Sequence, residues 1–284
     1  MPLDHLSFAT TPVVALRDEK PLWQGSGFFY LHQKEDIKVL YLVTNYHVIA
    51  GRAPEDPAGP VADHIVFQFH LDADVPGSVR PVRVPLFSRG GQRVWLQSES
   101  VPAADLVAIP VPAHICEGCR INCLDRNWMA DLDGDLSPIA PIHVVGFPYG
   151  YHDRENALPL WQTGALASEP SVDVDGQPMV LVDMPTYPGM SGAPAFALAS
   201  REQRLPGQNH LQPGAFRRFI GMYASLPVTD DGQFPEAFCS AGRAGLVARD
   251  AGNWGRIWRA RLIEELVSSV DTERWEREVL ADLA

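Results

Sequence analysis

The chain has 284 residues, of which 46% are hydrophobic and 20% are charged, a composition typical of a globular protein. Its net charge of −12 argues against nucleic acid or an anionic membrane as a main partner, since both require a basic face. The 25 prolines and 23 glycines separate short β-branched and aromatic runs, which predicts a mainly β fold with many turns.

The first twenty residues lack a basic segment followed by a continuous apolar segment. No later stretch approaches the roughly 18 apolar residues of a membrane span. The chain has four cysteines, fewer than a secreted domain stapled by disulfides usually carries. We therefore expect a cytoplasmic protein.

The first candidate functional residue follows two predicted strands. Residues 25–31 (GSGFFYL) and 41–44 (YLVT) are expected to pair as a hairpin through the polar segment between them. His47 comes shortly after the second strand, so its imidazole would be held on one side and open to a cleft on the other. It is either a structural histidine or a catalytic base.

A single carboxylate, Asp105, opens the apolar run at residues 104–111 (ADLVAIPV). Burial among such neighbours is costly unless the carboxylate accepts hydrogen bonds, and an imidazole N–H would satisfy it. Asp63, Asp72 and Asp74 lie in more polar or turn-like surroundings. We expect those three side chains to be solvated.

A cysteine cluster lies between the two halves of the chain. Cys116, Cys119 and Cys123 have C-x2-C-x3-C spacing, and Cys239 is available from the second half, so these thiolates could hold zinc. A second C-x2-C pair is missing, which favours free or partly buried thiols. The histidines show no metal-binding spacing, and we expect no cofactor.

Residues 187–196 (YPGMSGAPAF) contain the pattern G-x-S-G-x-P around Ser191. The pattern predicts a tight turn that brings two backbone N–H groups beside one hydroxyl, the arrangement of a nucleophile with an oxyanion hole. Glycine and serine also occupy ordinary turns, so the interpretation depends on a base and an acid elsewhere in the chain.

Two long polar segments follow Ser191, at residues 200–218 and 226–243. Each is either a solvated surface loop or a lid or exosite beside the cleft. From Trp254 onward, apolar residues recur at helical spacing, which predicts helices over residues 253–284 with Asn253 as the N-cap. The last of these helices either packs on the body or docks a partner.

Together these segments resemble those of the trypsin-like, chymotrypsin-fold serine peptidases, and specifically the HtrA-like bacterial branch. His47, Asp105 and Ser191 follow the family's order of His, Asp and Ser. Further segments that resemble family strands are residues 143–150, 161–168, 180–186, 219–225 and 245–248. The resemblance covers most of residues 22–270, and we expect no PDZ-like module after the C-terminal helix.

The resemblance implies a fold of two antiparallel six-stranded β-barrels with a C-terminal helical segment. The first barrel would span residues 8–115 and carry His47 and Asp105. A linker at residues 116–137 would lead to the second barrel, residues 138–250, which carries Ser191. The C-terminal helices would occupy residues 253–284.

The resemblance also implies a serine endopeptidase that works through an acyl-enzyme. Ser191 would attack the peptide carbonyl, His47 would take and return the proton, and Asp105 would orient the imidazole. The N–H groups of Gly189 and Ser191 would form the oxyanion hole. Met190 stands where the digestive enzymes have an Asp that pairs with a newly cleaved N-terminus, so we expect control by loop ordering, a partner or a substrate.

Pro185, six residues before Ser191, occupies the position of the family's pocket base, where a preference for Arg or Lys requires a carboxylate. Asp183 matches a structural Asp of the family. We therefore expect small or medium apolar side chains before the scissile bond, in a pocket formed by Met184, Pro185, Thr186, Tyr223, Ala224 and Ser225.

Two other functions stay open at this point. One is a protease effector or sensor domain that is silent until a protein partner engages it. The other is a peptidase-fold binding module whose chemistry has been lost, although the presence of all three residues and the glycines argues against it. The expected partners are a protein or peptide substrate and an activating protein.

Overall fold

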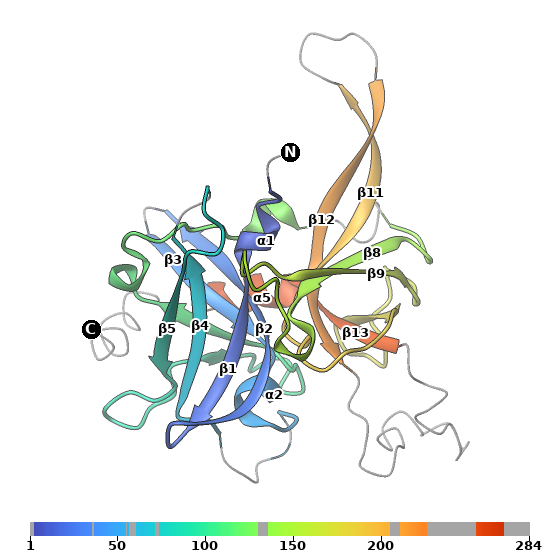
Figure 1. Ribbon diagram of the computed structural model, residues 1–284. Coiled ribbons are helices and arrows are strands. Elements are labelled where there is room, and N and C mark those ends of the chain that lie inside the picture. Colours follow the sequence, from blue (N-terminus) through green and yellow to red (C-terminus); the bar gives the residue numbers. More distant parts are fainter. Residues whose placement is uncertain are drawn as a thin grey trace.

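The computed structural model describes residues 3–35, 37–54, 56, 61–71, 74–129, 136–204, 211–225 and 254–269, with the backbone alone for residues 199–204 and 211–216. These residues form two β lobes, with the helix α5 (Ala260–Ser268) close to both (Figure 1). Two short 3₁₀ turns, η1 (Ala113–Cys116) and η2 (Arg126–Trp128), lie in the segment that connects the lobes. A third, η3 (Pro148–Gly150), lies in the loop after the first strand of the second lobe. The mainly β fold that the sequence predicts is confirmed.

The first lobe is a seven-stranded sheet in which every neighbouring pair is antiparallel, in the order β5-β4-β1-β2-β3-β7-β6. Among the described residues this half is not closed into the expected six-stranded barrel, because β6 has two residues and no ladder joins it to β5 at the other edge. The helix α1 (Leu6–Ala9) precedes the sheet and α2 (Tyr46–Ala50) follows β3. The strands are β1 (Thr10–Arg17), β2 (Lys20–Lys34), β3 (Ile37–Thr44), β4 (His64–His70), β5 (Val79–Pro85), β6 (Leu96–Gln97) and β7 (Val107–Val111).

The predicted hairpin is present as β2 and β3, with Phe28 opposite Val43. Both faces of β2 are buried, which explains why its sequence is a continuous apolar run rather than an alternating one. Phe28 and Tyr30 point into the core between the lobes, whereas Phe29 points into the core of the first lobe. The hairpin thus connects the two cores.

The second lobe is a closed barrel with the strand order β10-β13-β12-β11-β8-β9, which confirms the second predicted barrel. Neighbouring strands are antiparallel throughout. Ile142, Val180, Ala195 and Ile257 are among the side chains that fill its interior. The strands are β8 (Pro141–Gly146), β9 (Leu160–Leu166), β10 (Met179–Asp183), β11 (Pro194–Arg204), β12 (Leu211–Ser225) and β13 (Trp254–Arg259).

The predicted start of the C-terminal helices is wrong. Residues Trp254–Arg259 form β13, which pairs with β10 on one side and β12 on the other, and the helix begins only at Ala260. The apolar spacing of this segment fits either structure, and pairing on both edges decides for the strand. The barrel therefore continues beyond residue 250. Asn253, the strand expected at residues 245–248 and the helix expected after residue 271 lie outside the described residues.

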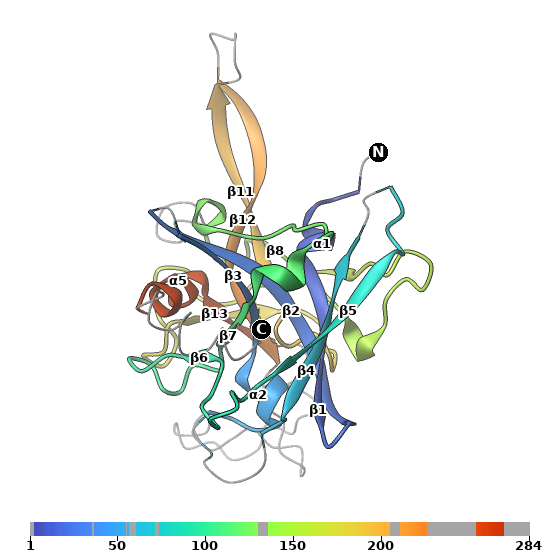
Figure 2. The ribbon, with the colours of Figure 1, turned by 90° about the vertical axis from the view of Figure 1, so that its left-hand side faces the viewer.

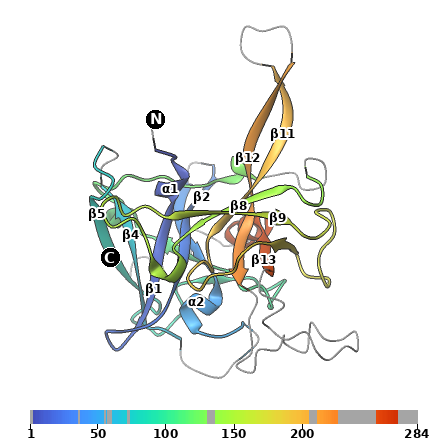
Figure 3. The ribbon, with the colours of Figure 1, turned by 45° about the vertical axis from the view of Figure 1, so that its right-hand side comes forward.

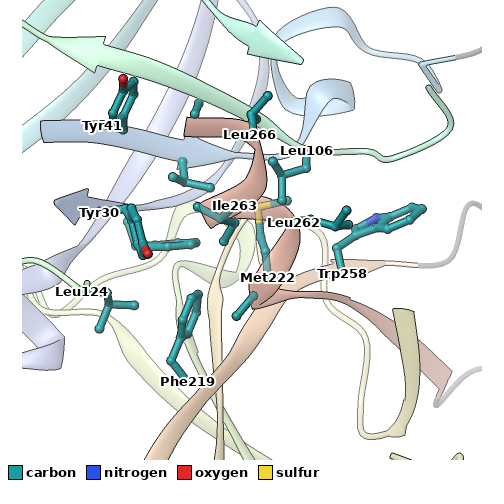
Figure 4. Close-up of a cluster of buried hydrophobic side chains, with 14 of the residues drawn as sticks. Tyr30, Tyr41, Leu106, Leu124, Phe219, Met222, Trp258, Leu262, Ile263 and Leu266 are labelled. Atoms are coloured by element: carbon teal, nitrogen blue, oxygen red, sulfur yellow. The ribbon is translucent and has the colours of Figure 1, made fainter. Parts of the chain in front are cut away.

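The helix α5 packs at the seam between the lobes rather than on the second barrel alone. It contacts β2, β6 and β7 of the first lobe and β12 and β13 of the barrel (Figure 2). Its apolar face closes a core to which both lobes contribute (Figure 4). Members of this core include Tyr30, Tyr41, Leu106, Phe219, Met222, Trp258, Leu262, Ile263 and Leu266.

The β11–β12 hairpin projects far beyond the barrel, away from the end of the molecule where α2 lies (Figure 3). The described parts of residues 200–218 therefore do not lie beside the cleft, where they were expected. β11 starts three residues after Ser191 and rises about 3.3 Å per residue, so its far end is remote from the serine turn. The second long segment, residues 226–243, lies outside the described residues.

Candidate active site

Two hydrogen bonds join His47 to Asp105, and a third, from Asn45, holds Asp105 in place. His47 lies at the start of α2, and Asp105 lies in the loop before β7, next to β3 in the sheet. The carboxylate accepts a hydrogen bond from the backbone N–H of His47 at 2.9 Å and contacts the ring Nδ1 at 2.6 Å. Asn45 donates its side-chain amide to the backbone carbonyl of Asp105 at 2.5 Å. The imidazole is thereby fixed on the Asp105 side.

The two side chains differ in exposure: Asp105 is 2% exposed and His47 is 32% exposed. Burial alone opposes the ionisation of Asp105, but the nearby His47 and Arg256 lower the pKa of its carboxyl below the usual range. Arg256 Nη2 lies 3.8 Å from the carboxylate. A buried carboxylate with these neighbours is charged, and it can hold the imidazole in one tautomer. Asp63 instead contacts His64, at 3.0 Å.

Two glycines shape the turn around Ser191. Gly189 and Gly192 have φ values of +92° and +90°, a region that other residues rarely adopt. A Cβ on Gly192 would lie 1.9 Å from the carbonyl oxygen of Ser26. The backbone N–H of Ser26 also donates to the carbonyl of Ser191 at 2.8 Å, so β2 passes directly behind the turn. Glycine is therefore required at positions 189 and 192, where φ is positive, and at position 192 also because β2 lies too close for a side chain.

Ser26 is a residue of the site that the sequence reasoning missed. Its hydroxyl donates to the carbonyl of Gly189 at 2.7 Å and accepts from the backbone N–H of Phe147 at 2.9 Å. Thr44 donates its hydroxyl to the carbonyl of Ser26 at 2.7 Å. The sequence feature that could have indicated Ser26 is its position as a polar residue between two glycines at the start of an apolar strand segment.

The backbone N–H groups of Gly189 and Ser191 have no acceptor among the described residues, whereas those of Met190 and Gly192 donate to Tyr187 and Tyr223. The Ser191 hydroxyl lies 3.1 Å from the hydroxyl of Ser225. Within the described part of the chain, no hydrogen bond joins Ser191 to His47. The turn therefore presents two free N–H groups beside a hydroxyl whose partner is Ser225.

His47, Asp105 and Ser191 meet at one cavity of about 510 Å³ between the lobes. The first lobe lines it with Trp23, Gln24, His47, Val48, Gly51, Arg52, Ala53 and Asp105. The second lobe lines it with Thr186, Tyr187, Pro188, Gly189, Ser191, Ser225 and Arg256. The structure thus brings together the three residues that the sequence singled out, although they come from three distant segments.

A family model described as a trypsin-like peptidase domain matches residues 25–202, more than half of the chain. The chain belongs to the trypsin-like peptidase family. The matched segment contains all three of these residues. The finer assignment to the HtrA-like branch stays a prediction. A comparison with curated proteins found no match.

Solved structures of several proteases resemble this trypsin-like chain. The MamO protease domain from Magnetospirillum magneticum is 14% identical, with 94% of this chain and 98% of that chain covered and a TM-score of 0.46. The serine endoprotease from Yersinia pestis is 14% identical, with 98% and 68% covered and a TM-score of 0.48. HL collagenase is 12% identical, with 93% and 94% covered and a TM-score of 0.47.

The substrate pocket expected from the trypsin-like resemblance needs correction. Thr186 and Ser225 line the cavity, but Met184, Tyr223 and Ala224 do not. All three are buried, with relative exposures of 0–1%: Met184 and Tyr223 inside the barrel, and Ala224 in the core between the lobes. Pro185 is exposed and also does not line the cavity. The predicted pocket was placed by counting positions along the chain. Successive side chains of a strand point to opposite faces, so several of the residues chosen in this way point away from the cavity.

Met190 is fully buried in the barrel core, where it packs with Met184, Ala193 and Tyr223. In this trypsin-like peptidase, an apolar anchor therefore stands where the digestive enzymes have a charged one. The N–H of Tyr149 also donates to the carbonyl of Pro188 at 2.6 Å. The turn is held by packing and by hydrogen bonds from neighbouring strands and loops.

The cysteine cluster lies apart from the cavity. Cys116, Cys119 and Cys123 are free, half-buried thiols against the core of the first lobe, and burial raises the pKa of Cys116 to about 11. Cys239 lies outside the described residues. In the part of the chain that the structure describes, no group of three His, Cys, Asp or Glu side chains could hold a metal ion. None of the described helices has the length and apolar character needed to span a bilayer.

Proposed function

We propose that the chain is a serine endopeptidase that hydrolyses peptide bonds through Ser191, His47 and Asp105. The observation that carries this proposal is the meeting of the hydrogen-bonded His47–Asp105 pair with Ser191 at one cavity between the lobes. Membership of the trypsin-like peptidase family supports the same reaction class. The substrate is a protein or peptide.

Catalysis begins when the Ser191 hydroxyl turns from Ser225 to the imidazole of His47. His47 accepts the proton while Ser191 Oγ bonds to the substrate carbonyl carbon. Asp105 stabilises the resulting imidazolium, and its burial strengthens this interaction because water cannot screen it. His47 then gives the proton to the leaving amine, and the C–N bond breaks to leave the acyl-enzyme, which water hydrolyses.

The developing oxyanion needs donors that are already in position. The N–H groups of Gly189 and Ser191 fit this need, because neither donates to an acceptor within the described residues. The Ser26 hydroxyl holds the Gly189 carbonyl on the far side of the same turn. The peptide planes therefore need little reorganisation when charge appears on the substrate.

The preference proposed for the residue before the scissile bond is a small or medium apolar side chain. Thr186 and Ser225 are the expected pocket residues that line the cavity. The Tyr223 ring fills space inside the barrel against Gly255, where a Cβ would lie 2.3 Å from the ring. This packing leaves little room inside the barrel for a long side chain, which supports the proposed preference.

A second candidate is a protease that a protein partner activates. The hydrogen-bond distance between Ser191 and Ser225, and the absence of one between Ser191 and His47 in the described region, favour a resting site. A partner or substrate that changes the environment of Ser225 would release the nucleophile. This version uses the same three residues and differs in what starts the reaction.

A fluorophosphonate probe tests the proposal, because it reacts with serines that a neighbouring base activates. We expect labelling of the wild type, and no labelling of Ser191→Ala. Ser168→Ala is a matched control, since Ser168 contacts Leu181 in the barrel wall and lies outside the cavity. If Ser191-dependent labelling is absent both alone and with cell extract, the chain is a binding module instead of an enzyme.

A further inference from the structure

Among the described residues, the lining of the cavity carries an excess of positive charge. Its charged members in this part of the chain are Arg52, Arg256, Asp105 and the titratable His47. The Asp105 carboxylate is already engaged by His47 at 2.6 Å, so it offers little to balance two guanidinium groups. Elsewhere the chain is strongly acidic, with a net charge of −12. Two arginines in one cavity of such a protein call for an anionic ligand.

Arg52 enters the cavity from the first lobe. It follows Gly51, the residue that ends α2, on the side of the cavity where Trp23 lies. Its Nε and Nη1 atoms are buried and have no hydrogen-bond partner in the described structure. Buried donors without a partner are costly. The guanidinium borders the cavity, and a carboxylate bound there would pair with it through charge-assisted hydrogen bonds.

Arg256 enters from the second lobe. It stands opposite Ala224 on β12, and strand alternation sends Ile257 into the barrel core and Arg256 to the other face. Its Nη2 lies 3.8 Å from Asp105, too far for a hydrogen bond, and its Nε is buried without a partner among the described residues. The Arg256 guanidinium also lies 5.6 Å from the centre of the Trp258 ring. This packing holds it in place beside the cavity.

We propose that the cavity recognises acidic peptides, with Arg52 and Arg256 each binding a carboxylate near the scissile bond. This inference rests on the proposed peptidase function and names its substrate class. Ser191 and His47 lie at the same cavity, with Arg52 on the first lobe and Arg256 on the second. The planar guanidinium matches the two oxygens of a carboxylate, which gives geometric as well as electrostatic selection.

The charge of the whole chain acts against this selection at long range, since a net charge of −12 repels an acidic peptide. Recognition must therefore come from contacts inside the cavity. A basic peptide would be attracted to the surface but would meet two guanidinium groups at the site. An acidic peptide would instead pair directly with the guanidinium groups that line the cavity.

A binding measurement tests the inference without requiring turnover. The host is Ser191→Ala, and the probes are fluorescein-labelled decapeptides of alternating Ala and Glu or of alternating Ala and Gln. By fluorescence anisotropy we expect the Glu peptide to bind about tenfold more tightly, as a charge-assisted hydrogen bond allows. Adding Arg52→Gln or Arg256→Gln should each reduce this ratio severalfold, and Arg89→Gln, an exposed arginine outside the cavity, should not.

Equal binding of the two peptides, or a ratio that neither arginine variant changes, would overturn the inference. Arg52→Lys and Arg256→Lys serve as second variants if a glutamine variant fails to fold. Each should lower the ratio of the two affinities, because lysine keeps the positive charge but cannot bind both oxygens of a carboxylate as the planar guanidinium does. Circular dichroism verifies the fold of each protein. Fluorophosphonate labelling of the wild type is measured independently of peptide binding. If Ser191 is labelled but the Glu peptide does not bind more tightly, only the proposed substrate class is refuted. If the Glu peptide binds more tightly but Ser191 is not labelled, only the proposed peptidase activity is refuted.

Discussion

The Ser26 hydroxyl donates a 2.7 Å hydrogen bond to the carbonyl oxygen of Gly189 and so ties the first lobe to the turn that carries Ser191. The same hydroxyl accepts a hydrogen bond from Phe147, so one side chain connects β2, the loop after β8 and the serine turn. Ser26 is fully buried. The orientation of the peptide planes around Ser191 therefore depends on a residue of the opposite lobe.

Replacing Ser26 with alanine should slow the reaction of Ser191. The change leaves the Gly189 carbonyl and the Phe147 N–H buried without partners, which costs about 1–3 kcal/mol. A turn that relaxes will displace the Gly189 N–H, and loss of one oxyanion donor lowers turnover by roughly 10²–10³. We expect Ser26→Ala to reduce the second-order rate of fluorophosphonate labelling by at least about tenfold.

The matched control is Ser168→Ala, which also removes a hydroxyl that accepts a backbone N–H, but in the barrel wall. It should lower the free energy of unfolding, measured with urea, and leave the labelling rate within about twofold of wild type. If both variants lose labelling in proportion to their lost stability, Ser26 has only a structural role.

Replacing Ser225 with alanine should have the opposite effect. The Ser191 hydroxyl loses the hydroxyl partner at 3.1 Å and keeps only the longer contact of 3.4 Å with the backbone N–H of residue 225, so it turns toward His47 more easily. A neutral hydrogen bond contributes about 1 kcal/mol, so the labelling rate should rise about fivefold. The rate is measured with the same probe at fixed pH. A fall in rate would instead mean that Ser225 assists the reaction.

Asp105 should make stability depend on pH in the acidic range. Burial opposes its ionisation, but His47 and Arg256 lower its pKa below the ordinary value of 3.8. Between the two pKa values the unfolded state binds more protons than the folded state, so stability rises with pH there. The contribution of Asp105 is complete above about pH 5 and is lost as the pH falls through the folded-state pKa.

Urea unfolding between pH 2.5 and about 6, followed by circular dichroism, measures this dependence. In the acidic range the free energy of unfolding of the wild type should rise with pH, and we expect this rise to be smaller in Asp105→Asn. Asp175→Asn, at an exposed turn, is the control and should show the same rise as the wild type. An identical rise in all three proteins would contradict a charged Asp105.

The residues of the candidate site could be found from the sequence where chemistry and local pattern coincide. His47 follows a strand, Asp105 is the lone carboxylate of an apolar run, and Ser191 stands in a glycine turn. Each is visible within about ten residues of chain. The β2–β3 hairpin was predictable for the same reason, because its strands are neighbours in the sequence.

The remaining features depend on segments that meet only in the folded chain. Ser26 acts on Gly189 across 163 residues, and Arg256 approaches Asp105 from β13. β13 itself was expected to be helical, since its local spacing cannot reveal that β10 and β12 pair with both of its edges. Closure of the first barrel would likewise require pairing between segments that are distant in the sequence. Among the described residues the edge strand β6 has only two residues and the sheet stays open.

The helix α5 should depend on a polar contact beneath its apolar face. Tyr30 donates its hydroxyl to Glu264 at 2.5 Å, and His32 Nδ1 lies 3.4 Å from the other oxygen of that carboxylate. Because a hydrogen bond to an ionised group contributes about 1.5–3 kcal/mol, Tyr30→Phe should lower the free energy of unfolding by that amount. Glu264→Gln should cost less, since the amide oxygen still accepts from Tyr30.

A double-mutant cycle in urea separates the contact from the loss of packing. If Tyr30 and Glu264 interact as the structure shows, the two changes together cost less than the sum of the single changes, by about 1 kcal/mol or more. Tyr41→Phe is the matched control, as Tyr41 is a fully buried tyrosine opposite Tyr30 on the neighbouring strand β3, whereas the hydroxyl that donates to Glu264 is that of Tyr30. Combined with Glu264→Gln it should give an additive result, and additivity in the Tyr30 cycle would show that the Tyr30 hydroxyl does not anchor the helix.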